Sequence, residues 1–280
     1  MTQMTHDSYG KSDVRVMKVI RGPERHDIVE YRVDIRLEGD LSEGYTEGDN
    51  TSVLPTDTMK NTVYAMARKH SFDSPEQFAL ILAEHFVGSQ PAIELAEIAV
   101  ASRPWQPMRV GTVTHPHAFT QSSGERRTAF VEHSDEATNV KAGIRDLIIL
   151  KSADSGFSDF VRDEYTTLEE TDDRVLASSL EATWSYTSRD VDFNLIHPGV
   201  RKALLKVFSN HDSLSVQHTL YAMGEKVLQD FGEVADIHIV MPNKHNLPVD
   251  LEPFDMDNPH QILMPIDEPS GHIEATLRRG

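Results

Sequence analysis

Histidine is the residue type in this sequence best suited to bind a metal ion or to transfer protons. The sequence contains 14 histidines and no cysteine. Two of them form the segment His115-Pro116-His117. On a β-strand, side chains two residues apart lie on the same face, so these imidazoles could bind a metal ion together. No acidic residue stands at a metal-ligand spacing from this pair. We therefore favour a turn or a hydrogen-bonded pair of histidines over a metal site.

The familiar catalytic and nucleotide-binding motifs are missing from the sequence. It contains no G-x-G-x-x-G after an expected strand, no G-x-x-x-x-G-K-[ST], no G-x-S-x-G and no H-E-x-x-H. Dinucleotide-binding, P-loop, serine-hydrolase and zinc-protease functions therefore lose their usual support. The lack of cysteine also excludes disulfides and cysteine-bound zinc.

Charge and hydropathy narrow the class of protein. The 280 residues include 27 Lys+Arg and 45 Asp+Glu, a formal net charge of −18, which would repel a phosphate backbone. The longest apolar runs, such as Leu147-Ile148-Ile149-Leu150, are far shorter than the ~20 residues of a membrane-spanning helix. Neither end of the sequence resembles a secretory or peroxisomal signal. These features predict a cytoplasmic protein with no nucleic-acid or membrane partner.

Several segments alternate apolar and polar side chains, as half-buried β-strands do. The two clearest are residues 14–20 and 28–37, and Gly22-Pro23 lies between them. This arrangement predicts an antiparallel pair near the N-terminus. Five later segments are candidate strands: residues 96–102, 129–133, 143–150, 180–186 and 237–241.

Four segments carry apolar residues at helical spacing: residues 57–69, 74–86, 198–208 and 213–231. The second begins Ser74-Pro75-Glu76, which reads as an N-cap, a proline at the first helical position and an acid in the first turn. We expect the third to begin at Pro198. The order of strands, two helices and strands occurs twice. It predicts an α+β protein with two tandem repeats, residues 1–136 and 137–280, each with its helices on one face of an antiparallel sheet.

Five segments are unusual enough to indicate a family. They are Tyr9-Gly10-Lys11, the PTDTMKNTVY segment at 55–64, residues 150–174 with the block RDEYTTLEETDDR, Ser215-Val216-Gln217, and the MPNKH segment at 241–245. Together these segments resemble the urate oxidases (uricases), enzymes of purine breakdown. The resemblance extends from about residue 9 to residue 276.

This resemblance implies a fold, an assembly and a reaction. The fold is the tunnelling fold, in which paired chains close a barrel and two barrels stack into a homotetramer. The reaction oxidises urate with O2 and water to 5-hydroxyisourate and hydrogen peroxide, the first step of urate degradation toward allantoin. The resemblance implies no metal and no cofactor, because deprotonated urate would itself reduce O2 while the protein supplies position and electrostatics.

The resemblance also implies which residues bind the substrate. Arg174 would offer its planar guanidinium to one edge of the urate anion, and Gln217 would both donate and accept a hydrogen bond. Phe157 would stack on the ring, and the backbone of Val216 would add a polar contact. The implied substrate-binding residues are Thr56, Asp57, Phe157, Arg174, Val216, Gln217 and Asn243.

A second implied group moves protons. Lys11 and Thr56 would form a dyad that deprotonates a hydroxyl or a bound water, and His245 would shuttle the proton onward. Asn243 and Thr56 would hold O2 and then the attacking water. Because Lys11, Thr56 and Asp57 precede the midpoint while the other residues follow it, the resemblance implies a site shared between two subunits.

Two segments depart from the family pattern. Asn246-Leu247-Pro248 stands where an aromatic residue is usual, and Ser270-Gly271-His272 interrupts a Gly-Leu-Ile-like run. Two alternatives stay open. One is a tunnelling-fold enzyme that processes pterins or purines by other chemistry, although Arg174 and Gln217 replace the carboxylate typical of pterin sites. The other is a purine-binding protein without catalytic activity.

Overall fold

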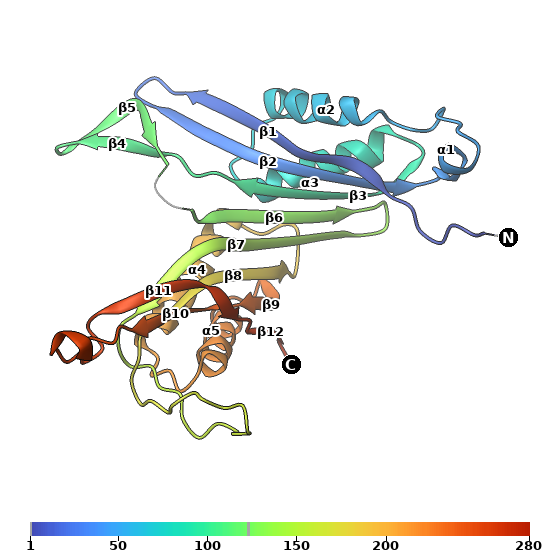
Figure 1. Ribbon diagram of the computed structural model, residues 1–280. Coiled ribbons are helices and arrows are strands. Elements are labelled where there is room, and N and C mark those ends of the chain that lie inside the picture. The colour runs from blue at the N-terminus through green and yellow to red at the C-terminus, as the bar shows by residue number, and fades with distance from the viewer. Residues whose placement is uncertain (1, 122–123) are drawn as a thin grey trace. The chain divides into compact units, whose positions relative to one another are not determined.

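The structure is a computed structural model that describes residues 2–121 and 124–280. The chain forms two compact units (Figure 1). The first comprises Met1–Gly143 with Ser185–Asn194, and the second comprises Ile144–Trp184 with Leu195–Gly280. Both combine antiparallel strands with helices, which confirms the predicted α+β class. In the described part of the chain, no helix is long and apolar enough to cross a membrane.

An antiparallel sheet forms the base of the first unit. Its strands are β1 (Tyr9–Arg21), β2 (His26–Gly39), β3 (Ile93–Ser102), β6 (Arg126–His133) and the beginning of β7 (Thr138–Lys151), hydrogen-bonded in the order β1-β2-β3-β6-β7. The β1–β2 turn closes where Gly22 N–H donates to Arg25 O (3.0 Å), as the sequence predicts. β1 is an edge strand, and Met17, Val19 and Ile20 on it are exposed.

Two helices cover one face of this sheet, α2 (Thr56–Lys69) and α3 (Pro75–Ser89) (Figure 1). On β2, Val33, Ile35 and Leu37 are fully buried, whereas Arg32 and Arg36, which alternate with them along the strand, are exposed. The alternation gives the sheet a core face and an open polar face. α3 begins as predicted, because Ser74 Oγ accepts a hydrogen bond from Gln77 N (3.2 Å). A short helix, α1 (Ser42–Thr46), follows β2.

The second unit also joins strands and helices. Its strands are the end of β7, β8 (Leu176–Tyr186), β9 (Val234–Val240), β10 (Asn243–Pro248), β11 (Leu263–Gly271) and β12 (Glu274–Arg278). Its helices are α4 (Phe193–Asn210), whose first two residues belong to the first unit, α5 (Val216–Asp230) and the short η1 (Glu252–Phe254). β8 pairs with both β9 and β10, and α5 packs against β9 and β12. Leu180, Trp184, Leu204 and Met223 are buried in this unit.

One predicted helix boundary is wrong. α4 begins at Phe193 and contains Pro198 in its interior, whereas the sequence placed its start at Pro198. Asp192 explains the earlier start, because its Oδ1 accepts a hydrogen bond from Asn194 N (3.1 Å) in the manner of an N-cap. Pro198 then costs the helix a single backbone hydrogen bond, the one to Asn194 O.

A hairpin that the sequence did not reveal contains the histidine pair. It consists of β4 (Gln106–Val110) and β5 (Val113–Thr120). His115 and His117 lie on β5, with ring centroids 5.1 Å apart, and His117 N–H donates to His115 Nδ1 (3.3 Å). The pair is therefore hydrogen-bonded but lies on a strand instead of a turn. Across the described residues, no three or more His, Asp or Glu side chains are arranged to hold a metal ion.

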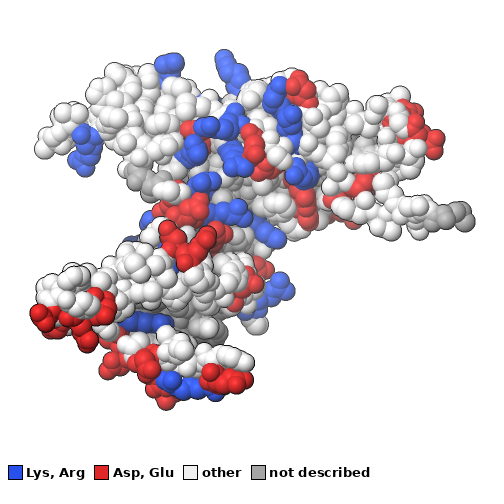
Figure 2. All heavy atoms as spheres, in the orientation of Figure 1, with Lys and Arg blue, Asp and Glu red and all other residues white. Residues whose placement is uncertain are grey.

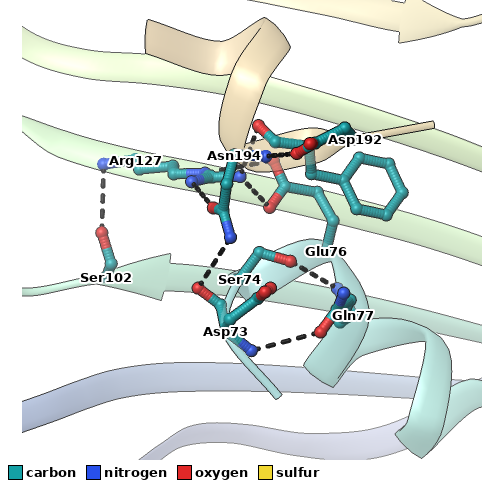
Figure 3. A network of polar contacts seen from close by, with 9 residues as sticks. Asp73, Ser74, Glu76, Gln77, Ser102, Arg127, Asp192 and Asn194 are labelled. Atoms are coloured by element: carbon teal, nitrogen blue, oxygen red, sulfur yellow. Dashed lines mark hydrogen bonds and ion pairs between the residues drawn. The ribbon is translucent and has the colours of Figure 1, made fainter.

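A buried ion pair joins three elements of the first unit (Figure 3). Glu76 in the first turn of α3 is fully buried, and Arg127 on β6 donates to both of its carboxylate oxygens (3.2 and 2.8 Å). Arg127 also donates to Asn194 Oδ1 (2.8 Å) and Phe193 O (3.1 Å) at the start of α4. Burial raises the pKa of Glu76, although the charge of Arg127 opposes this shift. Arg127 is thus the partner that makes a buried carboxylate tolerable here.

We expect Arg127→Met to lower the free energy of unfolding by about 3–5 kcal/mol, because Glu76 would remain in the core without its partner. Urea unfolding at fixed protein concentration, followed by circular dichroism, measures the change. The control is Arg145→Met, which removes a guanidinium that is 63% exposed and 3.8 Å from Glu181. It should change stability by less than about 0.5 kcal/mol. Equal losses in the two variants would contradict a structural role for the buried pair.

Candidate active site

A pocket of about 360 Å³ in the second unit collects three of the predicted site residues. Arg174 comes from the segment just before β8, and Asn243 and His245 come from β10. Leu168–Thr171 and His260 complete much of the wall. Asn246-Leu247-Pro248, the first departure from the family pattern, also lines the pocket, so that departure changes the wall directly.

Phe157 lies next to Arg174 and is held by backbone hydrogen bonds. The guanidinium carbon of Arg174 is 5.2 Å from the centroid of the Phe157 ring. Phe157 N–H donates to Thr171 O (2.7 Å), and Thr171 N–H donates back to Phe157 O (3.1 Å). Phe160 stacks on Phe157 with centroids 5.0 Å apart and an interplanar angle of 13°. The planar cation of Arg174 therefore lies over the aromatic ring of Phe157.

Arg174 is the strongest chemical feature of the pocket. Its Nε is buried and has no hydrogen-bond partner in the structure. Burial lowers the pKa of the Arg174 guanidinium, because a positive charge is less stable away from water. A buried, unpaired donor on a cation is costly unless an anion binds to it. The geometry therefore favours an anionic ligand whose edge matches the planar guanidinium.

The turn before α5 is tied to the loop that carries Phe157. Gly156 N–H donates to Ser213 O (2.8 Å), and Ser213 N–H donates to Asp154 O (2.9 Å). Ser215 then caps α5, since its Oγ accepts from His218 N (3.1 Å). Val216 and Gln217 are therefore held in the first turn of α5. Val216 is buried, whereas Gln217 is exposed and lies outside the pocket lining.

Two histidines that the sequence did not single out flank this helix start. The rings of His211 and His218 meet edge to face with centroids 4.4 Å apart, and His211 Nδ1 lies 3.2 Å from Thr219 Oγ1. Burial lowers the pKa of His211, and the nearby His218 and Lys151 add to this effect. His211 is thus stabilised in its neutral form, which avoids adding a positive charge at the helix N-terminus.

Asn243 has a buried polar neighbour that the sequence also left unnoticed. The Cα partner of Asn243 on β8 is Ser178, which is fully buried, and Ser178 Oγ has no hydrogen-bond partner in the structure. Directly opposite residues of an antiparallel pair share one face, so the hydroxyl and the amide lie on the same side. A serine between the buried Leu176 and Leu180 was the available sequence signal.

β10 and β11 set the direction of the other polar groups. The register of this pair shifts between Asn243 and His245, so the strand is irregular where the two side chains leave it. Gly271, in the second departure from the family pattern, lies opposite Asn243. Lys244, which also lines the pocket, has its Nζ 2.9 Å from Asp267 Oδ1, and this contact holds the pKa of Asp267 below its usual value.

The remaining predicted residues come together in the first unit. Lys11 is half-buried on β1, where the register with β2 shifts, and Thr56 is the first residue of α2. Asp57 follows it, and its pKa is lowered by a hydrogen bond from Lys60 and by the charges of Lys60 and Lys11. Lys11 and Asp57 are therefore near enough to interact electrostatically.

Two neighbours fix this first group. Gly10 packs so closely on β2 that a Cβ would lie 1.8 Å from Ile35 O, so only glycine fits before Lys11. Tyr9 OH accepts a hydrogen bond from Leu54 N (2.9 Å), which anchors the chain just ahead of Thr56. The structure thus sorts the predicted residues into two groups, one in each unit.

Comparison with known proteins gives a consistent result. The family model described as Uricase matches residues 7–132 and 140–274. The uricase of Arthrobacter globiformis is 42% identical over 273 residues, covering 98% of this chain and 89% of that protein. The uricase of Dictyostelium discoideum is 34% identical, with 100% and 98% covered. The crystal structure of the Arthrobacter globiformis uricase superposes with a TM-score of 0.95 at 41% identity, covering 100% of this chain and 96% of that one.

Proposed function

This chain belongs to the uricase family, and we propose that it oxidises urate with O2 and water to 5-hydroxyisourate and hydrogen peroxide. The observation that carries this conclusion is the match to uricases over nearly the whole length of both proteins. The pocket agrees with it, because the half-buried Arg174, whose Nε is buried and has no hydrogen-bond partner, favours a flat anion. The reaction balances without a further reactant, since urate loses two electrons, O2 gains them, and water supplies the new hydroxyl group.

Substrate binding in this proposal centres on Arg174 and Phe157. The guanidinium of Arg174 takes one edge of the urate anion with two parallel hydrogen bonds, which also gives its buried Nε a partner. Phe157 lies against the ring face, and Val216 and Gln217 bind the neighbouring edge through a backbone group and a side-chain amide. Asn243 lines the pocket, and in this proposal it binds O2 and later water together with Thr56.

Proton transfer in this proposal uses Lys11, Thr56 and His245. The Lys11 amine favours deprotonation of the Thr56 hydroxyl or of a water bound to it. Asp57 contacts the substrate near this dyad, and the charge of Lys11 helps to lower the pKa of the Asp57 carboxyl. The imidazole of His245 passes the proton on. The chain then contributes position and electrostatics and requires no cofactor.

The direct test is incubation of metal-free protein with urate in air. We expect the ultraviolet band of urate to fade while an equal amount of hydrogen peroxide forms. Arg174→Ala should raise the KM for urate at least about tenfold, because a charge-assisted contact to a buried anion is lost. The control is Arg162→Ala, which removes an exposed guanidinium that lies over Phe160. No turnover by the wild type between neutral and alkaline pH would refute the function.

Ser215→Ala tests whether the start of α5 positions the substrate. It removes the cap of α5, and Ser74→Ala removes the equivalent cap of α3. Each change should lower stability by about 0.5–2 kcal/mol. Only Ser215→Ala should also raise the KM for urate, because Val216 and Gln217 follow that cap. A matching rise in Ser74→Ala would show that loss of stability, and not loss of position, weakens binding.

The assembly in this proposal is a cytoplasmic homotetramer of two tunnelling-fold repeats, residues 1–136 and 137–280. The repeats are supported by the corresponding order of elements in the two halves. Apart from the short α1, the first half has β1-β2-α2-α3-β3 and the second has β7-β8-α4-α5-β9. The shared site is supported by the division of the candidate residues, with Lys11, Thr56 and Asp57 in one unit and the others in the second. In a two-fold pair, each site would combine the first group of one chain with the second group of its partner.

Mixed oligomers test this sharing quantitatively. Lys11→Met and Arg174→Ala chains should each be nearly inactive alone, but a mixed pair has one site with both changes and one with neither. Random pairing makes half of the pairs mixed, so roughly a quarter of all sites should be intact. Co-expression followed by an activity assay measures the recovered fraction. If verified mixed oligomers stay as inactive as the parents, each site is built within one chain.

A further inference from the structure

A fully buried hydroxyl next to the candidate active site has no role in the reaction described so far. It belongs to Ser178 on β8, and none of the residues that the structure describes forms a hydrogen bond with its Oγ. Leu176 and Leu180, which lie on the same face of β8, are buried as well. Because a buried hydroxyl without a partner costs free energy, it is stabilised by any polar group that turns toward it.

Asn243 is the residue directly across the strand pair from this hydroxyl. β10 lies between β8 and β11, and the Cα partners of Asn243 on these two strands are Ser178 and Gly271. Residues placed opposite each other share one face, with Cβ atoms about 4.5–5.5 Å apart. Gly271 has no side chain, and a Cβ built on it would lie 3.7 Å from the Asn243 Cβ. In the row formed by these three residues, Ser178 supplies the side chain that can hold the Asn243 amide.

The orientation of the Asn243 amide decides what it offers to the pocket that it lines. An amide has a carbonyl oxygen that accepts and an NH2 group that donates. If Ser178 donates its hydroxyl hydrogen to Oδ1, the Nδ2 group is left to donate into the pocket. O2 gains two electrons in the proposed reaction, so negative charge develops on it, and an aimed N–H donor stabilises that charge. The reversed amide would present its oxygen and repel the same charge.

Long-range charge cannot take the place of this contact. Residues 249–258 contain four exposed acids, and Figure 2 shows acidic side chains gathered at the lower left of the second unit, where Figure 1 draws this segment. Fixed charges steer ions such as urate but not a neutral diatomic molecule. The binding of O2 therefore depends on short-range donors such as the amide of Asn243. The four acids are Asp250, Glu252, Asp255 and Asp257.

We propose that Ser178 is a positioning residue for O2, whose hydroxyl donates to Asn243 Oδ1 and thereby aims Nδ2 at the bound oxygen molecule. This inference rests on the proposed function, because that function assigns O2 to Asn243. Ser178 does not line the pocket, so it acts through Asn243 and not by touching urate. It therefore affects the use of O2 and leaves the binding of urate unchanged.

Oxidation rates at saturating urate and varied O2 concentration test this role. Ser178→Ala should lower kcat/KM for O2 at least about tenfold, because the amide loses the hydrogen bond that orients it. The Kd for urate, titrated without O2, should stay as in the wild type. The urea midpoint should be unchanged or higher, since the variant loses a buried hydroxyl without a partner. Ser179→Ala is the matched control, because this serine is next on β8 and faces the other side, and it should leave all three values unchanged.

A double variant tests whether Ser178 acts through Asn243. Ser178→Ala combined with Asn243→Ala should be no slower with O2 than Asn243→Ala alone, because the orienting hydroxyl then has nothing to orient. Circular dichroism confirms the folding of each variant. Ser178→Cys, which keeps a similar volume but donates more weakly, replaces Ser178→Ala if that variant fails to fold.

Three results would overturn the role of Ser178 in an enzyme that oxidises urate. They are an unchanged kcat/KM for O2 in Ser178→Ala, a loss that appears in the Kd for urate instead, and losses that multiply in the double variant. A wild type that binds urate but never oxidises it would refute the proposed function, and the O2 role with it. The wild-type assay thus separates that failure from a failure of Ser178 alone.

Discussion

A carboxylate without access to water constrains much of the first unit. Glu76 is fully buried at the start of α3, where a helix N-terminus favours a negative charge but the surrounding core does not. Arg127 resolves the conflict, and its remaining donors bind Asn194 and the backbone of Phe193. Asn194 in turn donates to Asp73 O (3.3 Å), just before the cap of α3. The sheet, α3 and the beginning of α4 are thus fixed by one set of polar contacts.

The same contacts show which features of the fold can be predicted from the sequence and which cannot. The alternation in β1 and β2 and the Ser74-Pro75-Glu76 start of α3 are local patterns, and the structure confirms both. Pro198 predicts a later start for α4 than the structure has, because the local signal of Asp192 is weaker and Arg127 is distant in the sequence. β4, β5 and the last strands are largely exposed, so they lack the apolar alternation by which strands are found.

Some residues of the candidate site can likewise be predicted from the sequence, and others cannot. The family motifs predict Arg174, Asn243 and His245 as site residues, and one pocket of the second unit is lined by all three. The same motifs did not reveal Ser178 or the role of the Tyr9 hydroxyl, because each acts through a neighbour distant in the sequence, Asn243 and Leu54. Gln217 shows the opposite case, since its motif is plain but its side chain is exposed in the isolated chain. The motifs therefore indicate which residues take part in the reaction, whereas the residues that position them are found only from tertiary contacts.

The edge strand β1 has a consequence for how this protein must be handled. It is 13 residues long, carries Lys11, and presents exposed Met17, Val19 and Ile20 beside backbone groups that β2 leaves unpaired. A long edge strand with exposed apolar side chains can pair with strands of other molecules, although the charged residues of β1 oppose such pairing. In the oligomer proposed above, a chain that lost its partner would therefore tend to precipitate, and activity lost on dilution would return poorly on reconcentration. Storage life would then depend on keeping the protein concentrated, more than on the stability of either unit.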